Sequence, residues 1–298
     1  MKETCICNFD IKQSIREIDF NGLKIGGDKS FHFLRENENL SLPVYVLELN
    51  IFNLDESFHI VKDLYGKYFD DKRRLISEAQ KSECDILGLK FNIENFDEID
   101  DAVNLLKDLL PNVYKPLMIR GCNESKIDEV LIPKLIKVLD RECIVAFANE
   151  YTYKNIVPSV IEGNHILVIK TPIDVNRIKD MNLIVSKMGI DMNKILVDTD
   201  MGGLGYGLEY GYSIMERVKL AGFEGNDKLN MPIIAFCGEE SLKTKEAMCE
   251  DLDENFGDFK MRTKMIEVSS AIAVISAGAN VVVLNHPDSI STLKGLAK

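Results

Sequence analysis

The feature that most restricts the fold of this chain is a series of short apolar segments, each followed by a stretch with helical spacing. The apolar segments are rich in Val, Ile and Leu and do not alternate with polar residues, which is typical of parallel strands covered on both faces. They lie at residues 43–49, 85–91, 117–119, 143–148, 166–169, 195–197, 233–236 and 281–284. We therefore expect an α/β fold with eight buried parallel strands.

The stretches between these strands carry helix signals. Apolar residues recur at helical spacing over 99–110, and Pro111 marks a stop. The stretch Ser125-Lys-Ile-Asp128 resembles a capping box, while Asp174 is placed to cap a helix that Gly189 would end. Eight strand–helix units with short connections in about 250 residues predict a (β/α)8 TIM barrel. An open, doubly wound parallel sheet is the alternative.

Residues 1–40 lie outside this repeat and are expected to form an N-terminal extension to a barrel that occupies residues 41–298. Within the extension, Lys24-Ile-Gly-Gly-Asp28 looks like a turn, because glycine accepts backbone angles that other residues avoid. We therefore expect a short hairpin that plugs the bottom of the barrel.

Charge and hydropathy exclude several classes of function. The 298 residues carry a net charge of −12 without a basic stripe, so nucleic acid is not an expected partner. The apolar runs fall short of the ~20 residues that a membrane helix needs, and the N-terminus has no signal core, so we expect a cytoplasmic protein that does not enter a membrane. Acidic residues gather in 239–258, which indicates either a solvated insertion or a docking surface for a basic partner.

Metal and nucleophile signatures are missing from the sequence. The seven cysteines are scattered and include no Cys-x-x-Cys pair, whereas zinc and iron–sulfur clusters need grouped thiolates. The four histidines are isolated, and no Gly-x-Ser-x-Gly stretch occurs. We therefore expect no metal site, no iron–sulfur cluster and no catalytic residues in this chain.

Ligands of such a barrel meet the loops that follow the carboxyl ends of the strands. Five of the eight predicted strand ends supply an asparagine, namely Asn50, Asn92, Asn123, Asn149 and Asn285. Carboxamides donate and accept hydrogen bonds without charge, so this rim favours a neutral, amide-rich ligand; the alternative is that the asparagines cap helices and form turns. Asp198 is the only acid predicted at a strand end. It would orient a ligand, act as a general base or cap the next helix, with no second acid or histidine evident beside it.

A glycine-rich stretch follows Asp198. Four glycines, Gly202, Gly203, Gly205 and Gly207, are interleaved with Leu204 and Tyr206. The stretch lacks the lysine of a phosphate-binding loop and the spacing of a dinucleotide fingerprint. Glycines allow close approach to the backbone, and the two large side chains between them favour a surface pressed against something flat. A tight turn with no ligand is the alternative.

Several short motifs occur in the order of a known family from about residue 25 to the end. They are Ile25-Gly-Gly27, Gly121-Cys-Asn123, Pro172-Ile-Asp-Val-Asn176, Gly202-Gly-Leu-Gly-Tyr-Gly-Leu-Glu-Tyr210, Ile214-Met-Glu-Arg217, Met231-Pro-Ile-Ile234, Lys245-Glu-Ala247 and His286-Pro287. On these motifs the chain resembles the small subunit of the corrinoid iron–sulfur protein and its archaeal counterpart, the delta subunit of the acetyl-CoA decarbonylase/synthase complex.

The resemblance implies a barrel that pairs with a large subunit, which carries an iron–sulfur cluster and a cobalamin domain. It also implies that cobalamin is shared between the two subunits. The corrinoid would carry a methyl group from methyltetrahydrofolate, through its methyltransferase, to acetyl-CoA synthase in the Wood–Ljungdahl (reductive acetyl-CoA) pathway. Both enzymes would be transient partners. The residues implied to contact the corrinoid are Asn123, Asn149, Asp198, Gly202, Gly203, Leu204, Gly205, Tyr206 and Gly207.

Two stretches depart from the family pattern on the expected ligand face. Asp198-Thr-Asp-Met201 stands where relatives typically read Asp-Pro-Thr-Thr, and the stretch 236–240 also differs. Two other functions remain open. One is a pterin-binding TIM-barrel methyltransferase acting on methyltetrahydrofolate, in which Asn149 and Asp198 would hold the pterin ring. The other is an unrelated metabolic barrel enzyme, for which no acid–base pair is evident.

Overall fold

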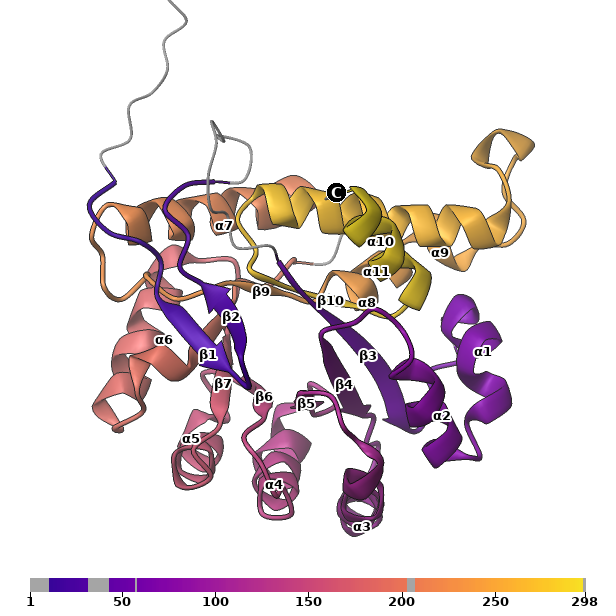
Figure 1. The fold of residues 1–298 in the computed structure, drawn as a ribbon, viewed down its shortest axis with the longest axis horizontal. Helices are drawn as coiled ribbons and strands as arrows, with labels where there is room; N and C mark the ends of the chain where they lie inside the picture. The colour runs from indigo at the N-terminus through magenta and orange to yellow at the C-terminus, as the bar shows by residue number, and fades with distance from the viewer. Residues whose placement is uncertain (1–10, 32–42, 57, 203–206, 297–298) are drawn as a thin grey trace, which may run out of the picture.

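The computed structural model describes residues 11–31, 43–56, 58–202 and 207–296. Its centre is a sheet of parallel strands (Figure 1): β3 (Val44–Phe52), β4 (Ile86–Phe91), β5 (Leu117–Arg120), β6 (Ile144–Ala148), β7 (Ile166–Lys170), β8 (Ile195–Asp198), β9 (Ile234–Ala235) and β10 (Val281–Leu284). The order is β8-β7-β6-β5-β4-β3-β10-β9, and a bridge between Val197 and Ile233 joins β8 to β9. The sheet thus closes on itself. The predicted TIM barrel is confirmed, and the open-sheet alternative is wrong.

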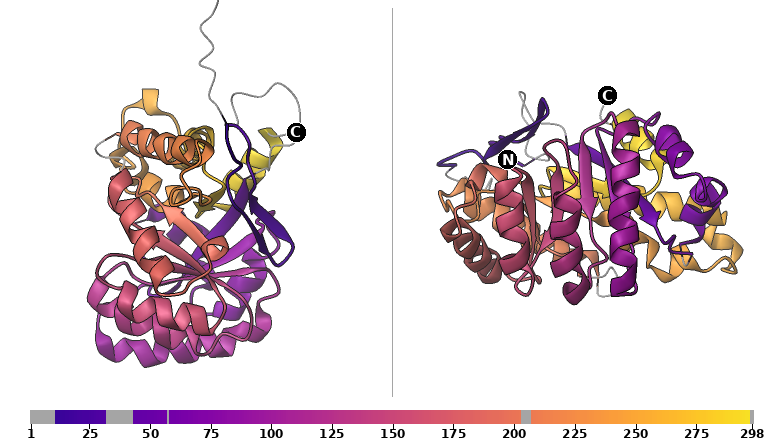
Figure 2. Two further views of the ribbon diagram at one scale, coloured as in Figure 1. Left: turned by 90° about the vertical axis from the view of Figure 1, so that its left-hand side faces the viewer. Right: turned by 90° about the horizontal axis from the view of Figure 1, so that it is seen from below.

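Helices surround this barrel, as the views from the side and from below show (Figure 2). They are α1 (His59–Tyr65), α2 (Lys72–Ala79), α3 (Ile99–Leu109), α4 (Ser125–Ile136), α5 (Tyr153–Glu162), α6 (Val175–Lys187), α7 (Leu208–Phe223), α8 (Cys237–Leu242), α9 (Lys245–Met248), α10 (Phe259–Ser276) and α11 (Pro287–Leu296). The connection after β9 is the longest, because α8, α9 and a 3₁₀ turn at Glu254–Phe256 precede α10.

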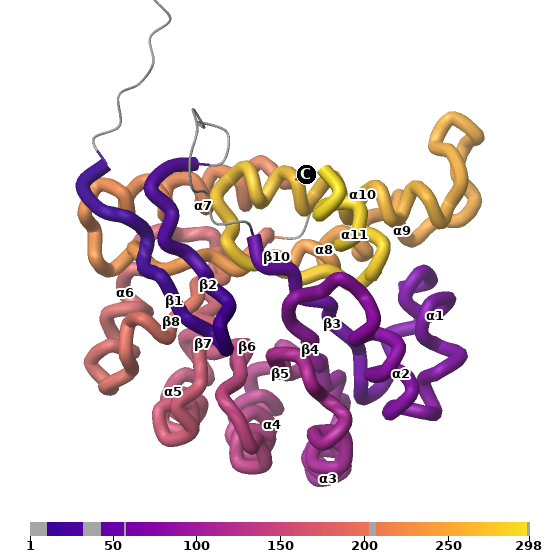
Figure 3. The backbone as a smooth tube through the Cα atoms, in the orientation of Figure 1, coloured from indigo at the N-terminus to yellow at the C-terminus, as the bar shows by residue number. Residues whose placement is uncertain are grey.

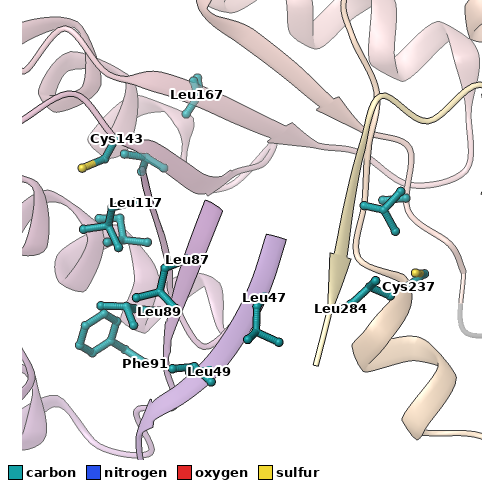
Figure 4. Close-up of a cluster of buried hydrophobic side chains, with 14 of the residues drawn as sticks. Leu47, Leu49, Leu87, Leu89, Phe91, Leu117, Cys143, Leu167, Cys237 and Leu284 are labelled. Atoms are coloured by element: carbon teal, nitrogen blue, oxygen red, sulfur yellow. The ribbon is translucent and has the colours of Figure 1, made fainter. Parts of the chain in front are cut away.

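Alternate residues of each strand serve two separate cores. The side chains of Leu47, Leu49, Leu87 and Leu89 point out of the barrel and pack against the helices, with Phe91 beside them (Figure 4). Their neighbours in sequence point into the lumen and form a second cluster with residues of the other strands, namely Val46, Ile86, Met118, Ile144, Ile166, Val168, Leu196, Ile234 and Val283. Burial on both faces explains why the strands read as continuous apolar runs.

A hairpin of β1 (Glu17–Phe20) and β2 (Leu23–Gly26) lies over the barrel (Figure 3). Its Ile18, Phe20 and Ile25 are buried in the lumen cluster, beside the first residues of several strands. The hairpin therefore packs against the amino-terminal end of the barrel, opposite the end where ligands bind.

A buried ion pair joins the turn after this hairpin to the barrel wall. Lys219 of α7 donates to the Asp28 carboxylate at 2.5 Å, to the Gly278 carbonyl at 2.9 Å and to Asn280 Oδ1 at 2.8 Å. Lys219 is 1% exposed and Asp28 is 2% exposed. Charges buried this deeply depend on their partners, so this contact fixes the extension to the barrel.

The helix ends agree with the sequence at one predicted cap and differ at another. Asp174 accepts hydrogen bonds from the backbone of Asn176 and Arg177 at the start of α6, as predicted. The capping box predicted at Ser125 is wrong, because Asp128 instead accepts from the backbone N–H groups of Cys122 and Asn123, in the loop before α4.

Candidate functional site

The strands end in a layer of charged side chains that closes off the apolar lumen. Lumen positions alternate along each strand, and the last such position is charged on four of them: Lys90 on β4, Arg120 on β5, Lys170 on β7 and Asp198 on β8. Lys90 pairs in register with Arg120, and Lys170 pairs with Asp198, which places these side chains side by side at the carboxyl end of the barrel.

Arg120 is the centre of this layer. Its guanidinium contacts Glu48 of β3 at 2.7 Å and Glu239 of α8 at 2.5 Å, and Lys90 contacts the same Glu239 carboxylate at 3.1 Å. Arg120 is only 3% exposed and Glu48 only 2%. Burial alone raises the pKa of Glu239, but the attraction of Arg120 and Lys90 outweighs it and holds that pKa well below the ordinary value. These cations are therefore already neutralised by carboxylates of the same chain.

Two adjacent aromatic rings lie against the same guanidinium. The Arg120 Cζ atom lies 4.9 Å from the ring centre of Phe147 and 4.7 Å from that of Phe236. The two rings meet edge to face at 4.8 Å. Cation–π contacts of this kind gain strength when the cation is desolvated, so the rings hold Arg120 in place as well as shielding it.

Asp198 belongs to a second charged group beside this layer. It is 1% exposed, and its Oδ1 atom accepts a hydrogen bond from the Asp200 backbone at 3.0 Å. The ammonium of Lys170 lies 4.0 Å from the Asp198 carboxylate and 3.5 Å from that of Asp200. Burial raises the pKa of Asp198 to about 6, against the attraction of Lys170.

The structure corrects two expectations for Asp198. It does not cap the following helix, because the N-cap of α7 is Gly207, and it instead orders the turn that holds Asp200. The expectation that no second acid lies beside it is also wrong, since Asp200 shares Lys170 with it. A carboxylate with a pKa near 6 can hold or release a proton near neutral pH, but its carboxyl group is enclosed and faces a lysine of its own chain.

A cavity of about 150 Å³ opens next to Lys170 on the rim. It is lined by Asn123, Asn149, Glu150, Tyr151, Lys170, Thr171, Pro172, Arg177, Met181 and Asp200. The fold thus brings together two of the predicted contact residues, Asn123 and Asn149, with the charged side chains beside Asp198. The hydroxyl of Thr171 is buried there without a hydrogen-bond partner.

The two asparagines of this cavity differ in their exposure and in their hydrogen bonds. Asn123 is exposed and adopts a φ of 69°, in the left-handed region that asparagine tolerates. The Oδ1 atom of Asn149 accepts from the backbone of Tyr151 at 2.9 Å and of Thr152 at 3.1 Å, and its Nδ2 donates to Ser125 at 3.3 Å. Asn149 therefore forms the turn before α5, as the alternative interpretation of the rim proposed, and contact with a ligand stays a prediction for both residues.

Other rim asparagines also make internal hydrogen bonds. Asn92 donates to the Asn53 carbonyl at 2.7 Å, and Asn285 donates to the Glu48 carbonyl at 3.3 Å. Asn50 keeps a buried Oδ1 atom without a partner. The rim is thus less available to a ligand than its composition indicates.

The glycine-rich stretch is described only at its two ends. Gly202 has a φ of 67°, and a Cβ there would overlap the side chain of Ile173; Gly207 has a φ of 103° and precedes the first turn of α7. Both ends therefore require glycine for reasons of backbone geometry. The other predicted contact residues, Gly203, Leu204, Gly205 and Tyr206, lie outside the described residues.

Glu48, Lys90, Arg120 and Glu239 were not predicted as site residues from the sequence. A signal was present for three of them, because each is a charged residue within or directly after an apolar run in a predicted strand. Counting in steps of two from the apolar lumen positions Val46, Ile86 and Met118 would have placed them inside the barrel. Glu239 lies on a helix, and only the three-dimensional structure brings it to Arg120.

Two further features bear on the class of protein. Among the residues that the structure describes, no group of three or more His, Cys, Asp or Glu side chains is arranged to hold a metal ion. Over the same ranges, every helix is too short or too polar to cross a lipid bilayer.

Comparisons with known proteins agree on one family. A family model described as CO dehydrogenase/acetyl-CoA synthase delta subunit matches residues 21–293. Acetyl-CoA decarbonylase/synthase complex subunit delta of Methanocaldococcus jannaschii is 28% identical over 200 residues, which cover 66% of this chain and 49% of that protein. Subunit delta 1 of Methanosarcina thermophila is 26% identical over 293 residues, which cover 92% of this chain and 65% of that protein. The chain thus spans about half to two thirds of the length of these curated relatives.

Solved structures that resemble the chain are TIM barrels of another kind. Xanthomonas albilineans dihydropteroate synthase with 4-aminobenzoic acid has a TM-score of 0.60 at 11% identity, covering 95% of this chain and 97% of that one. Yersinia pestis dihydropteroate synthase has a TM-score of 0.56 at 13% identity, with 95% and 99% covered. At such low identity the likeness concerns the fold alone.

Proposed function

The chain belongs to the CO dehydrogenase/acetyl-CoA synthase delta subunit family, and from this premise we propose that it is a non-catalytic subunit that covers a corrinoid held by a larger partner. The family resemblance predicted from the sequence motifs is thereby confirmed. In the proposed role, the partner supplies the iron–sulfur cluster and most of the cobalamin site. The corrinoid then carries a methyl group from methyltetrahydrofolate and its methyltransferase to acetyl-CoA synthase.

The observation that carries the non-catalytic part of the proposal is the pairing around Arg120. In a catalytic barrel, charged groups at the strand ends act on a substrate. Here Arg120 is held between Glu48 and Glu239 at 2.7 and 2.5 Å, and two adjacent aromatic rings lie against it. Charged groups that pair with each other in this way support the structure of the barrel rather than reaction chemistry.

The described residues fit a corrinoid as a cover and not as its whole site. The rim cavity of about 150 Å³ is smaller than the roughly 300–1,000 Å³ of pockets that enclose drug-sized ligands. It holds donors and acceptors together, with Asn123, Lys170 and Arg177 on its lining. These groups suit the carboxamide side chains at a corrin edge.

When bound, the corrinoid supplies the cobalt that carries the methyl group. This chain would contribute exclusion of water and orientation. Asn123 would hold an amide oxygen at the corrin edge. Arg177, which is exposed and also contacts Glu150 at 2.7 Å, would contribute its remaining donors there. Lys170 would stay paired with Asp198 and Asp200 beneath them. A cover that can move aside for each methyl partner would protect the cofactor between transfers.

The alternative of a pterin-binding methyltransferase has weaker support. It would use Asn149 and Asp198, but the Asn149 amide oxygen is engaged by the backbone of Tyr151 and Thr152. The Asp198 carboxyl group is enclosed and accepts from the Asp200 backbone. An isolated chain that binds methyltetrahydrofolate would favour this alternative.

Anaerobic affinity purification of the tagged chain from its native host tests the proposal. We expect a stoichiometric larger partner, with corrinoid and iron–sulfur absorption that the tagged chain alone does not show. A colourless chain without a partner that binds methyltetrahydrofolate in a calorimetric titration would contradict it. Mass spectrometry of the bands identifies the partner.

A further inference from the structure

An apolar groove of about 500 Å³ runs along the outer wall of the barrel, between the first turn of α7 and α10. Its apolar lining comes from Leu208 on α7, from Phe256 in the turn before α10, and from Met261, Met265 and Ile266 on α10. None of these residues belongs to the rim cavity or to the charged layer around Arg120. The groove thus lies outside both the rim cavity and the charged layer, although Leu208 directly follows Gly207.

The outer face of α10 is apolar where a solvated helix would be polar. Met261 is 53% exposed, Met265 is 45% exposed and Ile272 is 44% exposed, and Phe256 beside them is 50% exposed. Met261 and Met265 are one turn apart on the same face of the helix. A contiguous patch of this kind marks an interaction surface, and methionine adapts its shape to a partner.

An acidic segment adjoins one end of this groove, and its Asp258 is part of the lining. The segment from residue 250 to 258, which projects from the body between α9 and α10 (Figures 1 and 3), contains no Lys or Arg. Its five acids are Glu250, Asp251, Asp253, Glu254 and Asp258, all exposed. A partner that seats on the apolar groove must bring positive charge to this rim.

The acidic segment is held in place rather than loosely attached. Arg262 of α10 is buried and donates to the backbone carbonyls of Glu246 at 2.8 Å, Cys249 at 2.6 Å and Gly257 at 3.0 Å. One guanidinium thus ties both ends of the segment to the helix that forms the groove. A surface fixed before binding loses less entropy when a partner docks.

We propose that this groove docks an amphipathic helix of another protein, with an apolar stripe flanked by Lys and Arg. The apolar stripe would lie against Met261 and Met265, and the basic flank would face the acids of 250–258, in the manner of helix-in-groove recognition. A second copy of this chain is a poorer occupant, because it would bring two acidic rims to one contact. Anionic membranes are excluded for the same reason.

A fluorescein-labelled helical peptide with Leu on one face and Lys on its flanks is the probe, and fluorescence anisotropy with the full chain is the measurement. We expect saturable binding that weakens on the order of tenfold or more in the Met261→Asp/Met265→Asp variant, as loss of interface anchors does. The matched control is Ile184→Asp, which changes a 37% exposed apolar residue on α6 and should leave binding unchanged. A second peptide with Glu in place of Lys should not bind.

Three results would overturn the proposal. They are the absence of saturable binding, equal binding by the double variant, and equal binding of the Glu peptide. Light scattering of the free chain adds a fourth: a dimer that the double variant abolishes would assign the groove to a second copy. The substituted residues are exposed, so unchanged circular dichroism should accompany the loss and exclude misfolding.

Discussion

Removal of the Arg120 side chain is the change that most sharply tests the charged layer. In Arg120→Met, the apolar stem is kept, but the guanidinium between Glu48 and Glu239 is lost. Glu239 retains Lys90 at 3.1 Å and Lys243 at 2.8 Å. Glu48 is 2% exposed and loses its only ion-pair contact within 4.0 Å among the described residues. The damage therefore falls mainly on Glu48.

The size of the effect follows from this burial. Breaking a buried ion pair by removing one partner costs about 3–5 kcal/mol, because the other charge remains without compensation. Domains of ordinary stability unfold at a total cost of only about 5–15 kcal/mol. We therefore expect Arg120→Met to lower the free energy of unfolding by about 3–5 kcal/mol at neutral pH.

The deficit should shrink as the pH falls. Burial raises the pKa of Glu48, against the attraction of Arg120 and Lys90, and without Arg120 less attraction opposes it. A carboxyl group with a raised folded pKa binds its proton more tightly when folded. Its favourable contribution is thus complete below the ordinary carboxyl pKa and is lost as the pH rises through the raised value. Protonated Glu48 is neutral, so the missing Arg120 charge then destabilises the fold less.

Urea unfolding followed by far-ultraviolet circular dichroism measures this effect, since the chain contains no Trp. The matched control is Arg120→Met/Glu48→Gln, which removes the unpaired charge and should recover most of the lost stability. A single variant within about 1 kcal/mol of wild type at neutral pH would refute the reasoning, because exposed pairs contribute no more than that. Equal loss in the single and double variants would also refute it.

Three further changes give distinct outcomes. Lys219→Met should lower the unfolding free energy by about 3–5 kcal/mol in the same urea assay, because Asp28 is left buried without its cation. The same variant should expose the hairpin to protease. Adding Asp28→Leu to Lys219→Met should recover much of the lost stability. Wild-type stability should fall as the pH rises from about 4 to 6, and in Asp198→Asn this fall should disappear. The reason is that burial raises the pKa of Asp198 to about 6, so its stabilising contribution is lost as the pH rises through that value. An unchanged pH profile would contradict this. Gly207→Ala should lower the melting temperature, because it places a side chain at a φ of 103°, while Ala at Gly295, where a Cβ meets nothing within 4 Å, should not.

The architecture could be predicted from the sequence because one pattern repeats. Each barrel strand is buried on both faces, so runs such as 281–284 are apolar throughout. The helices between them are indicated by the helical spacing of their apolar residues. Cap details were less predictable. Asp128 lies where a capping box needs an acid, yet it accepts hydrogen bonds from the backbone of Cys122 and Asn123 in the loop before the helix.

The candidate site was predictable only in part. Asn123 and Asn149 end neighbouring strands, so their meeting at one cavity follows from the topology. The pairing of Arg120 with Glu239 does not, since the two residues lie 119 positions apart in the sequence and Glu239 reaches the rim only through the course of α8. The ends of adjacent parallel strands always lie at the same edge of the sheet. A contact made by a residue in a connecting segment depends instead on how that segment packs.

Hydrogen–deuterium exchange of the purified anaerobic complex, with the corrinoid present and after its removal, tests whether the carboxyl end of this barrel covers the corrinoid. We predict that the corrinoid slows exchange in the rim segments around Asn123, Thr171 and Asp200, and leaves the hairpin at residues 17–26 unchanged. Equal exchange of the rim in both states, or protection confined to the amino-terminal end of the barrel, would show that the corrinoid is not covered by the carboxyl end.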